Sequence, residues 1–148
     1  MPEQNLRGDE AIAHGALAAG IKLAASYPGS PATGVVEALI ELAPAHGVYV
    51  EWSSNERVAL ELAIGASIAG RRALVCVKNV GMNAIVDPLM TLTLTPVHGG
   101  LVILLGDDPG GYGSQNDQDT RPLATMLIST CNARPISRGS PVSRASAW

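Results

Sequence analysis

The stretch Leu101-Val102-Ile103-Leu104-Leu105 consists of five aliphatic residues in succession. A strand has such a continuous apolar pattern when both of its faces are covered, which is typical of parallel sheets. Three earlier apolar segments predict further strands, at Ile21–Tyr27, Val48–Trp52 and Ala73–Lys78. The aliphatic run therefore predicts the last strand of a four-stranded parallel sheet.

Helical patterns precede and separate these strands, over residues 9–20, 31–47, 53–70 and 82–95. Ser30 is suited to cap the second of these helices and Pro31 to occupy its first position, while Pro44 and Gly47 should end it. Pro88 is expected near the start of the fourth helix or at a kink in it. The alternation of helix and strand predicts an α/β fold of three layers, in which helices cover both faces of a parallel sheet.

The chain has 148 residues, of which 47% are hydrophobic and 16% charged, so it suits one domain with a buried core. We assign residues 1–130 to this domain. Residues 131–148 contain no acidic residue and are rich in Ser, Arg and Pro. That composition predicts a disordered or atypical tail.

The composition also disfavours several classes of function. A net charge of −3 gives no electrostatic reason to expect nucleic-acid binding. Cys76 and Cys131 lie far apart and belong to no pair with metal-ligand spacing, so we expect no metal site in this chain. Met1–Glu10 lacks the pattern of a signal peptide and no apolar run reaches membrane-spanning length, which predicts a soluble cytoplasmic protein.

Candidate site residues cluster where the predicted strands end. In open α/β sheets, ligands bind beyond the carboxyl ends of the strands. Four segments rich in glycine and polar residues are predicted to lie there: Tyr27–Pro31, Trp52–Glu56, Lys78–Asn83 and Gly106–Asn116. Every α/β protein needs turns at these places, so the clustering by itself favours a binding site only weakly.

Glu56 is the sharpest candidate, because it is a carboxylate in the first turn of an otherwise apolar helix. The structural alternative is a capping box, in which the Glu56 carboxylate accepts a hydrogen bond from the backbone N–H of Ser53. The residues alone leave both interpretations open, and the capping box is the commoner arrangement.

The turn after the first strand also has two interpretations. Ser30 and Pro31 could only start a helix, or they could hold an anion such as a substrate carboxylate at the positive end of that helix. Pro28 and Gly29 would let a flat ligand approach the backbone, because glycine has no Cβ in the way. Further along, Gly106-Asp107-Asp108 begins like the metal–diphosphate motif of thiamine enzymes. The Asn that such a motif requires lies much further along in those enzymes, so we reject this match.

Several stretches together resemble one family, the large subunit of indolepyruvate ferredoxin oxidoreductase and its relatives among the 2-oxoacid:ferredoxin oxidoreductases. The resemblance extends roughly from Gly8 to Arg121 and fades in the last part of the chain. The matching stretches are Gly8–Ala13, Tyr27–Pro31, Val48–Trp52, Asn55-Glu56, Val58-Ala59, Asp87–Met90, Asp107–Gly110, Ser114–Asn116 and Gln118–Arg121.

The resemblance implies that this chain is the pyrimidine-binding domain of a thiamine-diphosphate enzyme, in incomplete form. Members of the family bind thiamine diphosphate between two α/β domains, and the second domain holds Mg²⁺ and the diphosphate. By similarity Glu56 falls where the family carries the catalytic glutamate that bonds the pyrimidine ring nitrogen, which favours the functional interpretation over the capping box. The expected cofactor-binding residues are Tyr27, Pro28, Gly29, Glu56 and Asn83, and the expected substrate-binding residues are Ser30, Pro31 and Lys78.

The activity implied by the resemblance is the oxidative decarboxylation of 2-oxoacids, aryl pyruvates such as indolepyruvate in particular, with ferredoxin as the electron acceptor. The implied partners are the diphosphate-binding domain, a beta-type subunit, ferredoxin and coenzyme A, in an oligomeric enzyme whose iron–sulfur clusters lie outside this chain. We expect the chain to be inactive alone. Two alternatives remain open: a non-catalytic relic or interaction domain, and half of the site of a thiamine-dependent decarboxylase.

Overall fold

The computed structural model describes residues 5–95 and 97–130. Its centre is a sheet of four parallel strands in the order β2-β1-β3-β4. The strands are β1 (Leu23–Ser26), β2 (Tyr49–Trp52), β3 (Ala73–Lys78) and β4 (Leu101–Gly106). The strand order reverses after β2, so the connection from β2 to β3 passes over β1, and helices can cover both faces.

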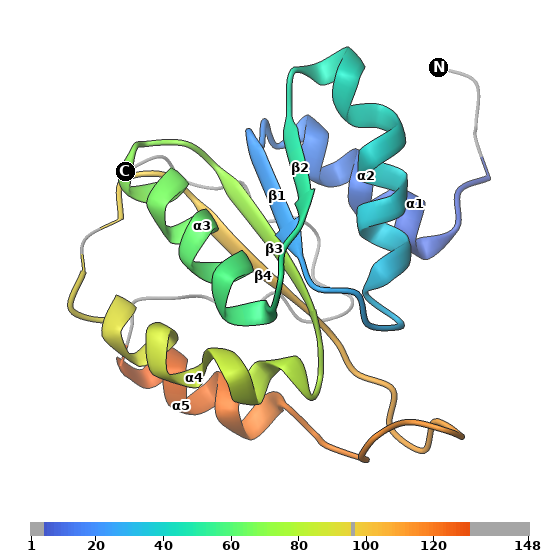
Figure 1. Cartoon of the computed structure of the whole chain (residues 1–148), viewed down its shortest axis with the longest axis vertical. Coiled ribbons are helices and arrows are strands. Elements are labelled where there is room, and N and C mark those ends of the chain that lie inside the picture. The colour runs from blue at the N-terminus through green and yellow to red at the C-terminus, as the bar shows by residue number, and fades with distance from the viewer. Residues whose placement is uncertain (1–4, 96, 131–148) are drawn as a thin grey trace.

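Helices form the two outer layers (Figure 1). On one face lie α1 (Gly8–Ala18) and α2 (Thr33–His46), and on the other lie α3 (Glu56–Ile68) and α4 (Gly81–Leu92). A fifth helix, α5 (Arg121–Thr130), contacts α4. The predicted three-layer α/β fold with a parallel sheet is therefore confirmed.

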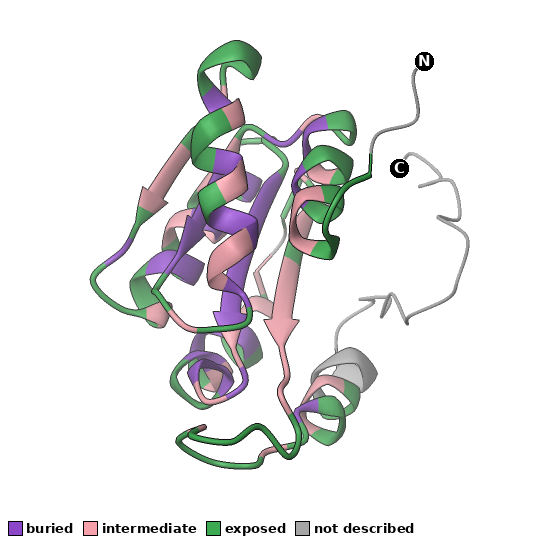
Figure 2. Cartoon of the chain, turned by 90° about the vertical axis from the view of Figure 1, so that its right-hand side faces the viewer, coloured by how far each residue is buried: buried purple, intermediate pink, exposed green. Residues whose placement is uncertain are grey.

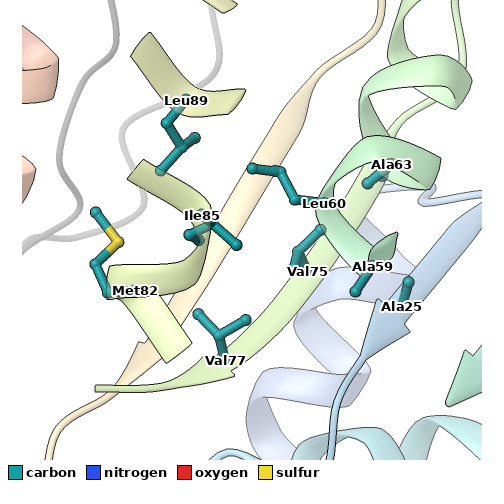
Figure 3. Packing of buried hydrophobic residues seen from close by; sticks show 10 residues of the cluster. Ala25, Ala59, Leu60, Ala63, Val75, Val77, Met82, Ile85 and Leu89 are labelled. Carbon is teal, nitrogen blue, oxygen red and sulfur yellow. The ribbon is translucent and has the colours of Figure 1, made fainter. Parts of the chain in front are cut away.

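The two faces of β3 form the two halves of the core. Leu74 and Cys76 pack with α1 and α2, whereas Val75 and Val77 pack with α3 and α4, as the alternation of side chains along a strand requires. Burial raises the pKa of the Cys76 thiol to about 12, so this cysteine is an inert core residue. Interdigitated side chains of α3, α4 and β3 are seen in Figure 3: Leu60, Val75, Val77, Met82, Ile85 and Leu89.

The last predicted strand differs from expectation in its burial. The run Leu101–Leu105 forms β4 as predicted, but its residues are only half-buried and Val102 is 47% exposed (Figure 2). Within residues 5–95 and 97–130, β4 pairs only with β3 and is an edge strand. The prediction that both faces of this strand are covered is wrong for the described residues. The described residues place a strand on one side of β4 only, the side of β3.

Pro44 and Pro88 both lie inside helices. Pro44 does not end α2, since the helix continues to His46 and ends at Gly47, whose φ of 60° is left-handed. A left-handed residue after the last turn is a common helix end, and glycine adopts it without a steric cost. Pro88 is buried in the interior of α4, which begins at Gly81. Residues 131–148, where the sequence predicts a disordered or atypical tail, lie outside the described residues.

No helix in the described part of the chain is both long enough and apolar enough to span a bilayer.

Candidate functional site

The carboxyl ends of the strands bring the candidate segments together. The Ser53 N–H, after β2, donates to the Ser26 carbonyl at the end of β1, at 2.7 Å. The Asn79 N–H, after β3, donates to the Gly106 carbonyl at the end of β4, at 3.0 Å. All four segments predicted from the sequence therefore begin at one edge of the sheet, because parallel strands end on the same side.

Glu56 is the first residue of α3, and it does not take part in the predicted capping box. The N-cap is Asn55, whose Oδ1 accepts a hydrogen bond from the Val58 N–H at 2.9 Å. The Ser53 N–H is already bonded to Ser26 and is not available to Glu56. Since Asn55 caps the helix, an interaction typically worth about 1 kcal/mol, the structural alternative for Glu56 is wrong.

The Glu56 side chain lies against the start of α4. A Cβ built on Gly81 would be 2.7 Å from the Glu56 Cγ and 2.8 Å from its Oε1. Glu56 is partly buried, and within the described residues its carboxylate makes no hydrogen bond and no ion pair. Both α3 and α4 begin here, so the partial positive charges of two helix N-termini attract this carboxylate. The arrangement places an acidic group, which has no partner among the described residues, at the carboxyl ends of the strands.

Lys78, a predicted substrate-binding residue, is engaged within the chain. Its Nζ donates to the Ser30 carbonyl at 2.8 Å and to Asp108 Oδ2 at 2.9 Å, and its side chain is only 14% exposed. The hydrogen bond from Lys78 lowers the pKa of the Asp108 carboxyl group, and the Ser114 hydroxyl contributes to the same shift. A substrate carboxylate would have to share Lys78 with Asp108 or displace it.

The turn at Ser30 and Pro31 is not the predicted helix start. The peptide bond between these residues is cis, and α2 begins at Thr33 with Ala32 as its N-cap. The Gly29 carbonyl accepts from the N–H groups of Ala32 and Thr33, at 3.0 and 3.2 Å, which forms a turn before the helix. The predicted capping role of Ser30 is therefore wrong, because Thr33 Oγ1 makes the local side-chain contact, accepting from the Gly29 N–H at 2.9 Å.

The neighbouring predicted residues Tyr27, Pro28 and Gly29 lie at the same edge. Tyr27 is 42% exposed and Pro28 is also exposed, so both are accessible. A Cβ on Gly29 would lie 2.9 Å from the Lys78 Cβ. Close packing against Lys78 is therefore a structural reason for the glycine, and the approach of a flat ligand stays a prediction.

Asn83, the remaining predicted cofactor-binding residue, pairs with Gln118 from the loop after β4. Asn83 Nδ2 donates to Gln118 Oε1 at 2.9 Å, and Gln118 Nε2 donates to Asn83 Oδ1 at 3.0 Å. Sequence reasoning did not select Gln118. It lies 35 residues from Asn83 in the chain, and no local pattern predicts a contact over that separation.

Asn79 is a polar residue that sequence reasoning missed. It is fully buried, and its Oδ1 accepts from the Val80 N–H at 2.8 Å, which fixes the orientation of the amide. Its Nδ2 has no hydrogen-bond partner in the described residues. A buried donor without a partner typically costs about 1–3 kcal/mol. Asn79 directly follows Lys78, the last residue of β3, and it therefore lies at the carboxyl end of that strand.

The comparisons with known proteins agree on one group. The sequence family described as "Pyruvate flavodoxin/ferredoxin oxidoreductase, thiamine diP-bdg" matches residues 14–90, more than half of the chain. The chain is 45% identical over 119 residues to indolepyruvate oxidoreductase subunit IorA of Pyrococcus abyssi, and 44% identical over 120 residues to the subunit of that name from Archaeoglobus fulgidus. A more distant relative is 2-oxoglutarate synthase subunit KorA of Methanocaldococcus jannaschii, 31% identical over 83 residues, which are 56% of this chain and 23% of that subunit.

The two IorA alignments cover 80% and 78% of this chain, but only 18% and 19% of the relatives, so the chain spans about one fifth of their length. Among solved structures, 2-oxoglutarate:ferredoxin oxidoreductase from Magnetococcus marinus, with 2-oxoglutarate, coenzyme A and succinyl-CoA bound, has a TM-score of 0.64 to this chain. That match covers 84% of this chain and 26% of the other, and its 18% sequence identity supports the fold alone.

Proposed function

This chain belongs to the pyruvate flavodoxin/ferredoxin oxidoreductase family, in its thiamine-diphosphate-binding domain, and from this premise we propose that it supplies the pyrimidine-binding half of a 2-oxoacid oxidoreductase site. The second half, with Mg²⁺ and the diphosphate group, would come from another domain. The observation that carries the proposal is the partly buried Glu56 carboxylate, which has no partner among the described residues and lies at the carboxyl edge of the sheet.

The side chains at this edge fit a nitrogen heterocycle. Glu56 presents a carboxyl group that can share a proton with a ring nitrogen, at the meeting point of two helix N-termini. Asn79 Nδ2 has no acceptor among the described residues, but it is fully buried and is not exposed to a ligand in this structure. The fit to the aminopyrimidine of thiamine diphosphate therefore rests on the Glu56 carboxyl group.

In the proposed reaction, bound thiamine diphosphate supplies the electron sink that lets a 2-oxoacid lose carbon dioxide. The role of this chain would be to position the pyrimidine ring and to control a proton on it. Glu56 would hold a proton between its carboxyl group and the pyrimidine ring nitrogen, and the exposed Tyr27 and Pro28 would flank the ring. Proton control of this type typically contributes about 10²–10⁴ in rate.

The substrate and the electron acceptor are the finer part of the proposal. Two relatives with 44–45% identity are named indolepyruvate oxidoreductase subunits, which favours an aryl pyruvate over other 2-oxoacids. We place the substrate carboxylate near Ser30, Pro31 and Lys78, where Lys78 provides the positive charge. Ferredoxin would accept the electrons, through iron–sulfur clusters held by other domains or by a beta-type subunit, and coenzyme A would accept the acyl group.

The substitution Glu56→Gln tests the proposal in an enzyme that contains this chain and the remaining domains. It should lower turnover of indolepyruvate by about 10²–10⁴-fold, because an amide cannot exchange the proton. The circular dichroism spectrum should stay unchanged, because Asn55 and not Glu56 caps the helix.

The matched control is Glu41→Gln, which removes an exposed carboxylate of α2 away from the strand ends and should leave turnover unchanged. Full turnover in Glu56→Gln would contradict the catalytic role. Failure of the complete enzyme to bind thiamine diphosphate would favour the non-catalytic relic instead.

A further inference from the structure

Gly81 has no conformational reason to be glycine. It is the first residue of α4, it is buried, and it is not among the described glycines with positive φ. Alanine stabilises a helix better than glycine does, so helix propensity also argues against a glycine here. The explanation must come from what a side chain at this position would meet.

A side chain at Gly81 would meet Glu56. The Cβ would lie 2.7 Å from Glu56 Cγ, 2.8 Å from Oε1 and 3.1 Å from Cδ. A real Cβ atom essentially never lies less than 3.0 Å from such a neighbour, so one of the atoms would have to shift. Because these atoms belong to the outer part of a flexible side chain, the Glu56 carboxylate would move and the helices would stay in place. Within the described residues, no hydrogen bond or ion pair would hold the carboxylate against this displacement.

We propose that Gly81 is a positioning residue, whose missing side chain seats the Glu56 carboxylate against the N-terminus of α4. This inference rests on the proposed function of Glu56. In this role Gly81 acts only through the location of the Glu56 carboxylate. A misplacement of about 1 Å in such a group can lower a rate by about 10²-fold.

Three substitutions in the full chain test the contact by thermal unfolding. Gly65→Ala, in α3, is the matched control, because nothing lies within 4 Å of the added Cβ, and it should raise the Tm by about 3 °C. Gly81→Ala should raise the Tm by less, because the new methyl group displaces Glu56. In a Glu56→Ala background the obstacle is absent, so Gly81→Ala should raise the Tm as much as Gly65→Ala does. Equal effects of Gly81→Ala in both backgrounds would overturn the inference.

Turnover in the complete enzyme tests the consequence of the contact. Gly81→Ala should lower kcat by about 10²-fold and leave the KM for the 2-oxoacid unchanged, since Glu56 is assigned to the cofactor and not to the substrate. Gly65→Ala should change neither constant. An unchanged kcat in Gly81→Ala, in an enzyme that loses turnover on Glu56→Gln, would refute the positioning role. Full turnover in Glu56→Gln would refute the proposed function itself, and the unfolding measurements keep the two failures distinct.

Discussion

The ion pair between Lys78 and Asp108 is the clearest charged interaction at the edge of the sheet. The two groups come from the ends of β3 and β4 and are both mostly buried, with side chains 14% and 26% exposed. In the folded chain, the hydrogen bond from Lys78 holds the pKa of Asp108 below the ordinary value of 3.8. A carboxyl group whose pKa is lowered by folding stabilises the folded state above its unfolded pKa, and this contribution is lost as the pH falls through the folded pKa.

We therefore predict that Asp108→Asn changes the acid dependence of stability. The free energy of unfolding of the wild-type chain should fall more steeply below about pH 3.8 than that of the variant. Above that pH, the variant should be uniformly less stable. Urea unfolding at pH values between about 2 and 7 measures both effects. Lys78→Met should weaken the acid dependence of the free energy of unfolding in the same way. If the double variant showed a still weaker acid dependence than either single variant, the pairing would be contradicted.

On the scale of elements, a side-chain contact joins the end of β4 to the start of α5. The Thr120 hydroxyl lies 2.8 and 2.7 Å from the two carboxylate oxygens of Asp107, and the Thr120 N–H donates to Asp107 Oδ2 at 3.3 Å. Thr120 is only 3% exposed, and its carbonyl accepts the first hydrogen bond of α5 from the Ala124 N–H. This contact closes the loop over residues 107–120, which carries Asp108 and Gln118.

Thr120→Val should loosen this loop and α5 while the sheet stays folded. The loss of a hydrogen bond to a carboxylate should cost about 1.5–3 kcal/mol. Hydrogen exchange should accelerate in α5 and in the loop, and not in β3. Thr125→Val is the control, because Thr125 only donates to the Arg121 carbonyl within the same helix. Equal exchange rates in the two variants would show that the Asp107 contact does not hold the loop.

At the scale of the whole molecule, the surface carries exposed aromatic side chains. Every aromatic residue in the described part of the chain is more than one third exposed: Tyr27 at 42%, Tyr49 at 56%, Trp52 at 37% and Tyr112 at 108%. Aromatic side chains are usually buried in cores or enriched at interfaces. Tyr27 and Trp52 lie at the carboxyl ends of β1 and β2, beside the candidate site, whereas Tyr49 lies at the start of β2. Together with the half-buried β4, these exposed side chains support the proposal that this chain works with further domains.

We predict that thiamine diphosphate with Mg²⁺ binds this chain only when the remaining domains are present. The cofactor would lie between two domains, and one half-site cannot offset the loss of translational and rotational freedom on binding. Isothermal titration calorimetry should detect no binding to the isolated chain at millimolar cofactor and micromolar binding to the complete enzyme. Equal affinities in both forms would mean that the site is complete within this chain.

The sequence by itself determined the fold class and the segments that follow the strands at their carboxyl ends. Apolar runs and helical periodicity are properties of short segments, so four strands, the helices between them and the parallel arrangement could be predicted without knowledge of any contact. The rule that ligands bind beyond the carboxyl ends of parallel strands selected Glu56, Lys78 and Asn83, and the structure places all three at or after strand ends, while their roles stay predictions. The family was also predicted correctly, because its stretches extend over most of the chain.

Only the tertiary structure decided which side chains meet. The ion pair of Lys78 with Asp108, the amide pair of Asn83 with Gln118 and the contact of Gly81 with Glu56 join segments distant in the chain. Local periodicity carries no information about such pairs, since they depend on the order of the strands and on how the helices pack over them. Helix ends were missed for a related reason. Asn55 is the N-cap of α3, and the Ser53 N–H instead donates to Ser26 of the neighbouring strand.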